Sequence, residues 1–116
     1  MKAILIDPRS QTISEVVYDG NWKSIGPWID AYTFDVVQIG NDDIIYVDDE
    51  GLFKAERGFF WMPGWPHPLA GKGLVLGDSQ YGEPEDVHTD IELFRNSVKF
   101  MDGLTVAMLT KTGVFA

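Results

Sequence analysis

Apolar and polar residues alternate along much of the first half of the chain, with the two-residue period of half-buried β-strands. β-branched and aromatic residues dominate these runs. We predict strands at Lys2 to Ile6, Thr12 to Tyr18, Phe34 to Ile39 and Ile44 to Val47. Turn residues separate the first two strands and the last two, so each pair is predicted to form an antiparallel hairpin.

A continuous apolar run follows later in the chain, at Gly73 to Gly77. Such a run predicts a strand in the centre of a sheet, where both faces are covered. Leu52 to Ala55 is predicted to extend the preceding strands, and the weak alternation of Leu104 to Met108 predicts an edge strand. Lys111 to Gly113 has the composition of a turn before the tail.

Two segments have helical spacing instead. Thr89 and Glu92 fit a capping box, and an apolar stripe at i, i+3, i+7 and i+10 then predicts the principal helix, residues 89–101, ended by Asp102-Gly103. Aromatic and aliphatic residues between Trp22 and Tyr32 recur three and four apart, but Pro27 forbids a helix interior at its own position. We therefore predict a short helix, residues 27–32, with Pro27 in its first position.

Together these elements predict an α+β fold, with a mainly antiparallel sheet of about five strands packed by the helix of residues 89–101. A length of 116 residues favours a single domain over residues 1–116. The helix is expected to present four residues, Ile91, Phe94, Val98 and Met101. The sheet is expected to meet them with five residues, Val36, Ile39, Ile45, Val75 and Leu76.

Composition narrows the class of protein. The chain has no cysteine, which excludes disulfides, thiolate metal sites and cysteine nucleophiles. Its apolar runs are too short for a membrane span, and the five-residue run near the start is shorter than the apolar core of a signal peptide. We therefore predict a cytoplasmic protein without membrane contact.

The net charge of the chain is −9, and the charged residues are unevenly distributed along it. Residues 24–53 carry seven acids and residues 73–94 carry six, in both cases without lysine or arginine. Direct nucleic-acid binding needs a basic face, which this pattern does not offer. A candidate acidic surface comprises seven residues, Asp42, Asp43, Asp48, Asp49, Glu50, Asp78 and Glu83.

Three interpretations of these acids are open. Carboxylates at strand ends form the backbone hydrogen bonds of turns and keep a surface soluble. The 13 acids would also cover roughly 22 Å of duplex at about one charge per 1.7 Å, which favours a DNA-mimic inhibitor as an alternative function. Carboxylate oxygens are hard ligands, so a metal-dependent hydrolase is a further alternative, although the spacing matches no calcium loop and we predict no metal or other cofactor.

The densest feature is the aromatic segment, residues 59–69, which holds four large aromatics and three prolines. Its aromatics are either a lid over the sheet or an exposed platform for a protein partner, a homodimer included. The candidate partner-binding residues are Phe59, Phe60, Trp61, Trp65 and His67.

Catalytic motifs are absent. No serine lies in a Gly-x-Ser-x-Gly elbow, and the only histidines are His67 and His88, too far apart in sequence for a two-histidine helical motif. Gly71-Lys72-Gly73 lacks the full phosphate-loop spacing. The sequence therefore predicts a non-enzymatic protein.

The turn signatures also carry a resemblance. Residues 34–51, with Tyr46-Val47-Asp48-Asp49-Glu50-Gly51 at their end, resemble a family of short phage, prophage and bacterial proteins of unknown function. Pro68-Leu69-Ala70-Gly71 and the turn of residues 77–83 add to the likeness, which covers residues 1–101. The family carries no activity to transfer. The resemblance implies a non-enzymatic accessory or protein-interaction module of a mobile element.

Overall fold

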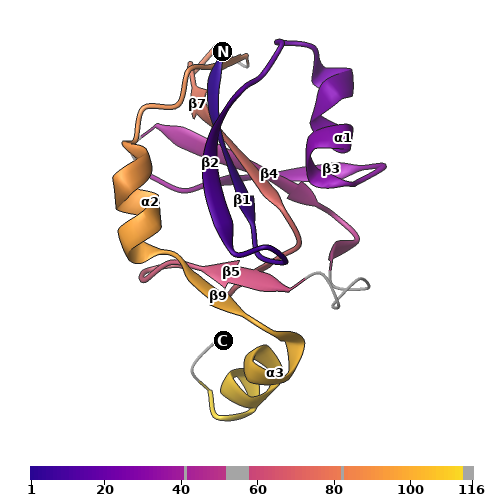
Figure 1. Ribbon diagram of the computed structural model, residues 1–116, viewed down its shortest axis with the longest axis vertical. Coiled ribbons are helices and arrows are strands. Elements are labelled where there is room, and N and C mark those ends of the chain that lie inside the picture. Colours follow the sequence, from indigo (N-terminus) through magenta and orange to yellow (C-terminus); the bar gives the residue numbers. More distant parts are fainter. Residues whose placement is uncertain (41, 52–57, 82, 114–116) are drawn as a thin grey trace.

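The computed structural model describes residues 1–40, 42–51, 58–81 and 83–113 and is built around one antiparallel sheet (Figure 1). Its path runs β2-β1-β7-β4-β3, and the two-residue strand β8 pairs with β7. The bounds are β1 Lys2–Asp7, β2 Thr12–Val17, β3 Phe34–Gln38, β4 Asp43–Asp48, β7 Gly73–Asp78 and β8 Pro84–Glu85. The α+β class, both predicted hairpins and the central place of the Gly73 strand are confirmed.

Alternation along the strands divides the core between the two faces of this sheet. Ile45 and Val47 of β4 contribute to one apolar cluster, while Ile44 and Tyr46 contribute to the other. Both faces of β4 and β7 are covered, so β4 is buried along its whole length. The sheet is therefore the middle layer of the molecule, and the layers on its two faces differ in kind.

A second, three-stranded sheet covers the first face together with helix α2. Its order is β6-β5-β9, with β5 Phe59–Trp61, β6 Leu69–Ala70 and β9 Lys99–Met101. Phe60 of β5 is completely buried and points at Gly73 of β7, where a Cβ atom would lie 2.7 Å from the Phe60 ring. Only glycine leaves room for this ring, so Gly73 sets how closely the two sheets approach.

The second face is covered by much less of the chain. A single 3-10 turn, η1 Trp22–Ser24, leads directly into the five-residue helix α1 Ile25–Ile29. Ile25 and Ile29 of α1 reach the core there, beside Tyr18. Figure 1 shows α1 and α2 on opposite sides of the molecule. A five-residue helix cannot cover a six-stranded sheet, so this face keeps hollows beside α1.

The predicted principal helix is wrong in its extent. Helix α2 spans only Ile91–Ser97, and its cap is Asp90, whose side chain accepts a hydrogen bond from the Glu92 N–H group. Phe94 is buried in the first cluster, as predicted, with Ile91 and Val98 packed against that cluster. Val98 has extended backbone, and Met101 lies in β9, paired with Phe59. Strand pairing with β5 therefore replaces the last turn of the predicted helix. Leu76 faces the other side of the sheet and Val36 is exposed, so neither meets α2 as predicted.

Two further elements differ from prediction. The short helix begins two residues before Pro27 and ends at Ile29, so Pro27 is its third residue rather than its first. Proline fits there because the first four N–H groups of a helix have no partner within it. Leu104 to Met108 belong to helix α3 Gly103–Lys111, not to an edge strand, since the Asp102 side chain caps it at the Thr105 N–H group. The expected strand of residues 52–55 lies outside the described residues.

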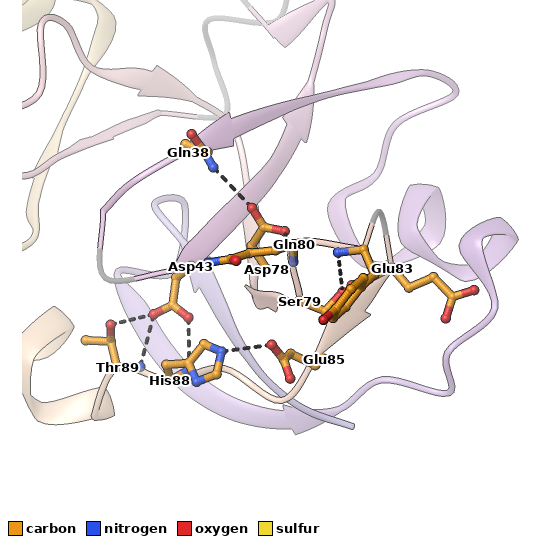
Figure 2. Close-up of polar contacts among 10 residues, drawn as sticks. Gln38, Asp43, Asp78, Ser79, Gln80, Glu83, Glu85, His88 and Thr89 are labelled. Atoms are coloured by element: carbon orange, nitrogen blue, oxygen red, sulfur yellow. Dashed lines mark hydrogen bonds and ion pairs between the residues drawn. The ribbon is translucent and has the colours of Figure 1, made fainter.

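A buried carboxylate fastens the sheet to the segment before α2 (Figure 2). Asp43, only 1% exposed, accepts hydrogen bonds from the His88 N–H at 2.9 Å and from the Thr89 N–H at 3.0 Å. The Thr89 hydroxyl donates to the same carboxylate, so Thr89 binds Asp43 instead of capping the helix. His88 in turn contacts Glu85 through its ring, at 3.2 Å.

We expect Asp43→Ala to lower the free energy of unfolding by about 3 kcal/mol, because it leaves two N–H groups without their charged acceptor. Urea denaturation measures this loss. Asp42→Asn is the matched control, since Asp42 is exposed and asparagine tolerates its left-handed backbone, φ 61°. Equal stability of the Asp43→Ala variant and the wild type would contradict the anchoring role.

Candidate functional site

The aromatic segment lies over the first face of the sheet, with its first two rings turned inward. Phe59 and Phe60 are buried, so the prediction that they contact a partner is wrong for the folded chain. Pairing of β5 with both β6 and β9 holds them there. The Trp65 ring meets the Phe60 ring edge-on, with centroids 5.8 Å apart.

The other three candidates of this segment remain at least partly accessible. Trp61 and Trp65 are half-buried, and the Trp61 indole N–H donates to the Trp65 carbonyl oxygen at 3.1 Å. His67 is exposed, with its Nδ1 atom 2.9 Å from the Pro68 carbonyl oxygen. The segment is thus mainly a lid, and its exposed residues are Pro63, Gly64, Pro66 and His67.

The candidate acids do not form one surface. Asp43 and Asp48 are buried, so the prediction that they belong to an acidic surface is wrong. Asp48 instead accepts a hydrogen bond from the Glu50 N–H group at 2.9 Å. Asp42, Asp78 and Glu83 lie toward one end of β4, and Asp49 and Glu50 lie beyond the other end. A six-residue strand separates the two groups by roughly 20 Å. The carboxylates mostly serve turns and strand contacts, as Asp78 does by accepting from the Gln38 amide at 3.1 Å (Figure 2).

Exposed aromatic surface is found on the other side of the sheet, around η1 and α1. Trp22 is 67% exposed and Tyr32 is 97% exposed. Pro27 is exposed as well, and Trp28 is half-buried. We call these four residues the α1 surface. Large exposed aromatics grouped in this way are unusual on a protein that works without a binding partner.

Trp22 is held by a hydrogen-bonded turn. The Asp19 carboxylate accepts from the Asn21 N–H at 2.8 Å and from the Ser24 hydroxyl at 2.7 Å. These bonds hold the pKa of Asp19 below its ordinary value. The Asn21 side chain in turn accepts from the Lys23 N–H at 3.1 Å. The backbone on both sides of Trp22 is therefore fixed before any ligand arrives, which lowers the entropy cost of binding.

The end of α1 turns Tyr32 outward. Asp30 adopts left-handed backbone, φ 56°, and the Ala31 N–H donates to the Gly26 carbonyl oxygen at 2.9 Å. A Cβ atom at Gly26 would lie 2.5 Å from the Ala31 carbonyl oxygen, so only glycine permits this tight ending. Lys72 secures the same corner through an ion pair with Asp30, at 2.9 Å.

Two hollows adjoin the α1 surface. The outer groove, about 560 Å³, is lined by Trp22, Pro27 and Tyr32 together with neighbouring residues of α1. The second hollow, which we call the tyrosine cavity, has about 390 Å³ and is lined by Tyr18, Tyr46 and Glu83 among others. Trp22 and Phe34 line both, so the two hollows are adjacent.

Chemistry in this region rests on aromatic rings and phenol groups. Burial raises the pKa of both Tyr18 and Tyr46, and each phenol also has a neighbour that adds to the rise: Tyr46 for Tyr18, and Asp78 for Tyr46. Both therefore stay protonated in neutral solution. Within the described part of the chain, no three histidine or acidic side chains are grouped so as to hold a metal ion.

Sequence reasoning placed the candidate partner-binding residues between Phe59 and His67 and did not single out the α1 surface, although the sequence contains one indication of it. Trp22, Trp28 and Tyr32 were recognised only for their helical spacing, and of these only Trp28 and Tyr32 fall in the predicted helix of residues 27–32. The five-residue helix α1 has one inner face, and Ile25 and Ile29 occupy it. So short a helix cannot bury Trp22, Trp28 and Tyr32 as well, and the sequence alone shows that the segment has more aromatic residues than one helix face can hold.

The raised tyrosine pKa values predict a loss of stability in alkaline solution. A phenol whose folded pKa exceeds its unfolded value contributes its full stability below the unfolded value, near 10, and loses it as pH rises through the folded pKa. We expect Tyr18→Phe to make this alkaline decline shallower. Urea denaturation between pH 8 and 11.5 measures it, with Tyr32→Phe as an exposed control. A decline of the same steepness in the Tyr18→Phe variant would contradict the prediction.

Comparison with known proteins finds no family model, curated protein or solved structure that matches the chain. The resemblance carried by residues 34–51 and 68–83 therefore stays a prediction. No described helix is long and apolar enough to cross a membrane.

Proposed function

We propose that this chain is a non-enzymatic accessory protein that binds a protein partner through the α1 surface. The observation that carries the proposal is the exposure of Trp22 and Tyr32, which both line a groove of about 560 Å³. Tryptophan and tyrosine are among the residues most enriched at the energetic centres of interfaces. The groove that these residues line can bury a side chain of the partner.

Order in the surface supports the proposal further. Trp22 lies in a turn fixed by the Asp19 and Asn21 side chains, and Tyr32 follows a helix end that only Gly26 permits. Rigid aromatic anchors lose little conformational freedom when they bind. We therefore favour this surface over the tip of the aromatic segment, whose two tryptophans are half-buried in the lid.

A photo-crosslinking experiment in the native host tests the proposal. A photoreactive phenylalanine replaces Tyr32 in one variant and Leu93 in another. Leu93 is also exposed but lies on α2, on the opposite side of the molecule. We expect a discrete protein adduct from position 32 and none from position 93, because only the first lies in the proposed interface.

Trp22→Ala is the second arm. Trp22 is mostly exposed, so this variant should fold with nearly unchanged stability. Loss of an interface anchor weakens binding by about 30-fold or more, so the adduct from position 32 should disappear. An adduct of twice the chain mass would make the partner a second copy. Adducts of equal yield from both positions, or none from position 32, would overturn the proposal.

A further inference from the structure

The main sheet has two edges, and they differ in what lies against them. β2 forms one edge, where the Arg95 guanidinium of α2 donates to the Ile13 carbonyl oxygen at 3.2 Å. β3 forms the other edge, and no described residue pairs with its outer side. Another extended chain can pair with an uncovered strand edge, because its backbone donors and acceptors are unused. The outer side of β3 is therefore the open edge of this sheet.

Hydrogen bonding to β4 determines which backbone groups of β3 face outward. The Ile39 N–H donates to the Asp43 carbonyl oxygen at 3.2 Å. Bonded and non-bonded pairs alternate in an antiparallel ladder, so the odd-numbered residues of β3 bond to β4. The N–H and C=O groups of Phe34, Val36 and Gln38 therefore point away from the sheet. Only an extended backbone has donors and acceptors at this two-residue spacing.

A small pocket adjoins the open edge on the first face of the sheet. It has about 110 Å³, lies between β3 and the aromatic segment, and has room for one aliphatic side chain. Five of its seven lining residues are apolar, among them Val37, Ile39 and Trp65, and the other two are Gln38 and His67. We call it the edge pocket. A strand added beside β3 places every second side chain on this face, next to Val37.

Acidic side chains lie along the open edge and at both of its ends. Asp35 is exposed in the middle of β3, on the first face. Asp49 lies beyond the start of the strand and accepts from the Thr33 hydroxyl. Asp78 lies at the other end and accepts from the Gln38 amide at 3.1 Å (Figure 2). The edge therefore offers negative charge along its whole length.

Described cations lie apart from this edge. Lys23 lines the outer groove, with its ammonium 5.9 Å from the centre of the Trp22 ring. Lys72 forms an ion pair with Asp30, at 2.9 Å. None of the described lysine and arginine residues lies in β3 or lines the edge pocket. A basic segment therefore complements the open edge better than an acidic one does.

We propose that a partner protein adds an extended segment to β3, antiparallel to it. The segment has an aliphatic residue opposite Val37, which enters the edge pocket, and a lysine or arginine two positions later, opposite Asp35. Its backbone pairs with the outward groups of β3. β3 begins at Phe34, which also lines the outer groove, so the segment continues from the α1 surface. The strand site rests on the proposed function, because the partner bound at the α1 surface supplies this segment.

A second copy of this chain is a poorer occupant of the open edge. Two β3 strands that pair about a two-fold axis at Val36 set the Asp49 end of one strand against the Asp78 end of the other. Each copy also has a net charge of −9, and like charges repel. The added segment therefore belongs to a different, basic protein.

A heptapeptide tests the strand site without the partner. In the acetylated and amidated peptide Thr-Lys-Thr-Leu-Thr-Lys-Thr, the leucine and both lysines share one face of an extended chain. At saturating peptide, we expect hydrogen exchange of the Val36 N–H group to slow at least about tenfold, because strand pairing covers this group. NMR measures both the binding and the exchange. Failure to bind, or binding without protection of the Val36 N–H group, would overturn the proposal.

Two modified peptides separate strand pairing from binding by side chains alone. N-methyl groups on the third and fifth residues remove N–H groups that face β3, whereas N-methyl groups on the fourth and sixth residues remove N–H groups that face solvent. We expect the first peptide to bind at least about tenfold more weakly than the second, because it loses two hydrogen bonds. Equal binding of the two peptides would rule out strand pairing.

A third peptide tests the charge of the segment. It has glutamate in place of both lysines, and we expect it to bind about tenfold more weakly at low salt, with a smaller difference at high salt. Equal or tighter binding of the acidic peptide would overturn the assignment to a basic segment.

Two proline variants locate the binding. The Tyr18 N–H donates to the Met1 carbonyl oxygen at 2.8 Å, so the Val17 N–H group faces outward from β2 as the Val36 N–H group does from β3. Proline at either position removes an outward N–H group and leaves the bonds to the neighbouring strand intact. We expect Val36→Pro to abolish binding of the heptapeptide and Val17→Pro to leave it unchanged. Unchanged binding in the first variant, or lost binding in the second, would contradict the assignment to β3.

The two proposals fail in different ways. Heptapeptide binding that protects the Val36 N–H group, without a crosslink at position 32, would keep the strand site and remove the partner at the α1 surface. A crosslink at position 32 without heptapeptide binding would keep the α1 surface and overturn the added strand. A dimer in analytical ultracentrifugation, with the Val36 N–H group protected in the absence of peptide, would identify a second copy and overturn the assignment to a different protein.

Discussion

Packing of the Phe60 ring over Gly73 determines how the two sides of the main sheet differ. The ring is fully buried, and a side chain at Gly73 would collide with it. With that contact in place, β5 lies close across the first face and brings β6 and β9 with it. The first face is thereby covered by the second sheet and by α2. Phe59, Phe60 and Leu69 of the aromatic segment are buried in this layer.

The second face has no comparable layer. The tetrad of Leu74, Leu76, Ile44 and Tyr46 faces η1 and α1, which together span only eight residues. Aromatic rings at the margin of this short cover are packed on one side and open on the other. The hollows beside α1 follow from this difference in area.

Much of the main sheet could be predicted from the sequence, because its strands depend on local alternation and on turn residues. The limits of the helices could not. Ile91, Phe94, Val98 and Met101 fit a helical stripe, but β9 forms by pairing with β5, some forty residues earlier in the chain, and no local pattern reveals that partner. Asp102 shows a different ambiguity. Aspartate before glycine was interpreted as a helix end, whereas its side chain caps the beginning of α3.

The two aromatic segments of the chain show why composition alone does not predict exposure. Phe59 and Phe60 lie in a strand that finds partners on both edges, and this pairing carries their rings into the core. The segment from Trp22 to Tyr32 has no such partner, because η1 and α1 bond within themselves and Asp30 ends the helix after five residues. In these two segments, the burial of the rings therefore follows from whether the backbone joins a larger element. Gly26 and Pro27 keep α1 short, so the residues that limit this helix also keep the proposed binding surface open.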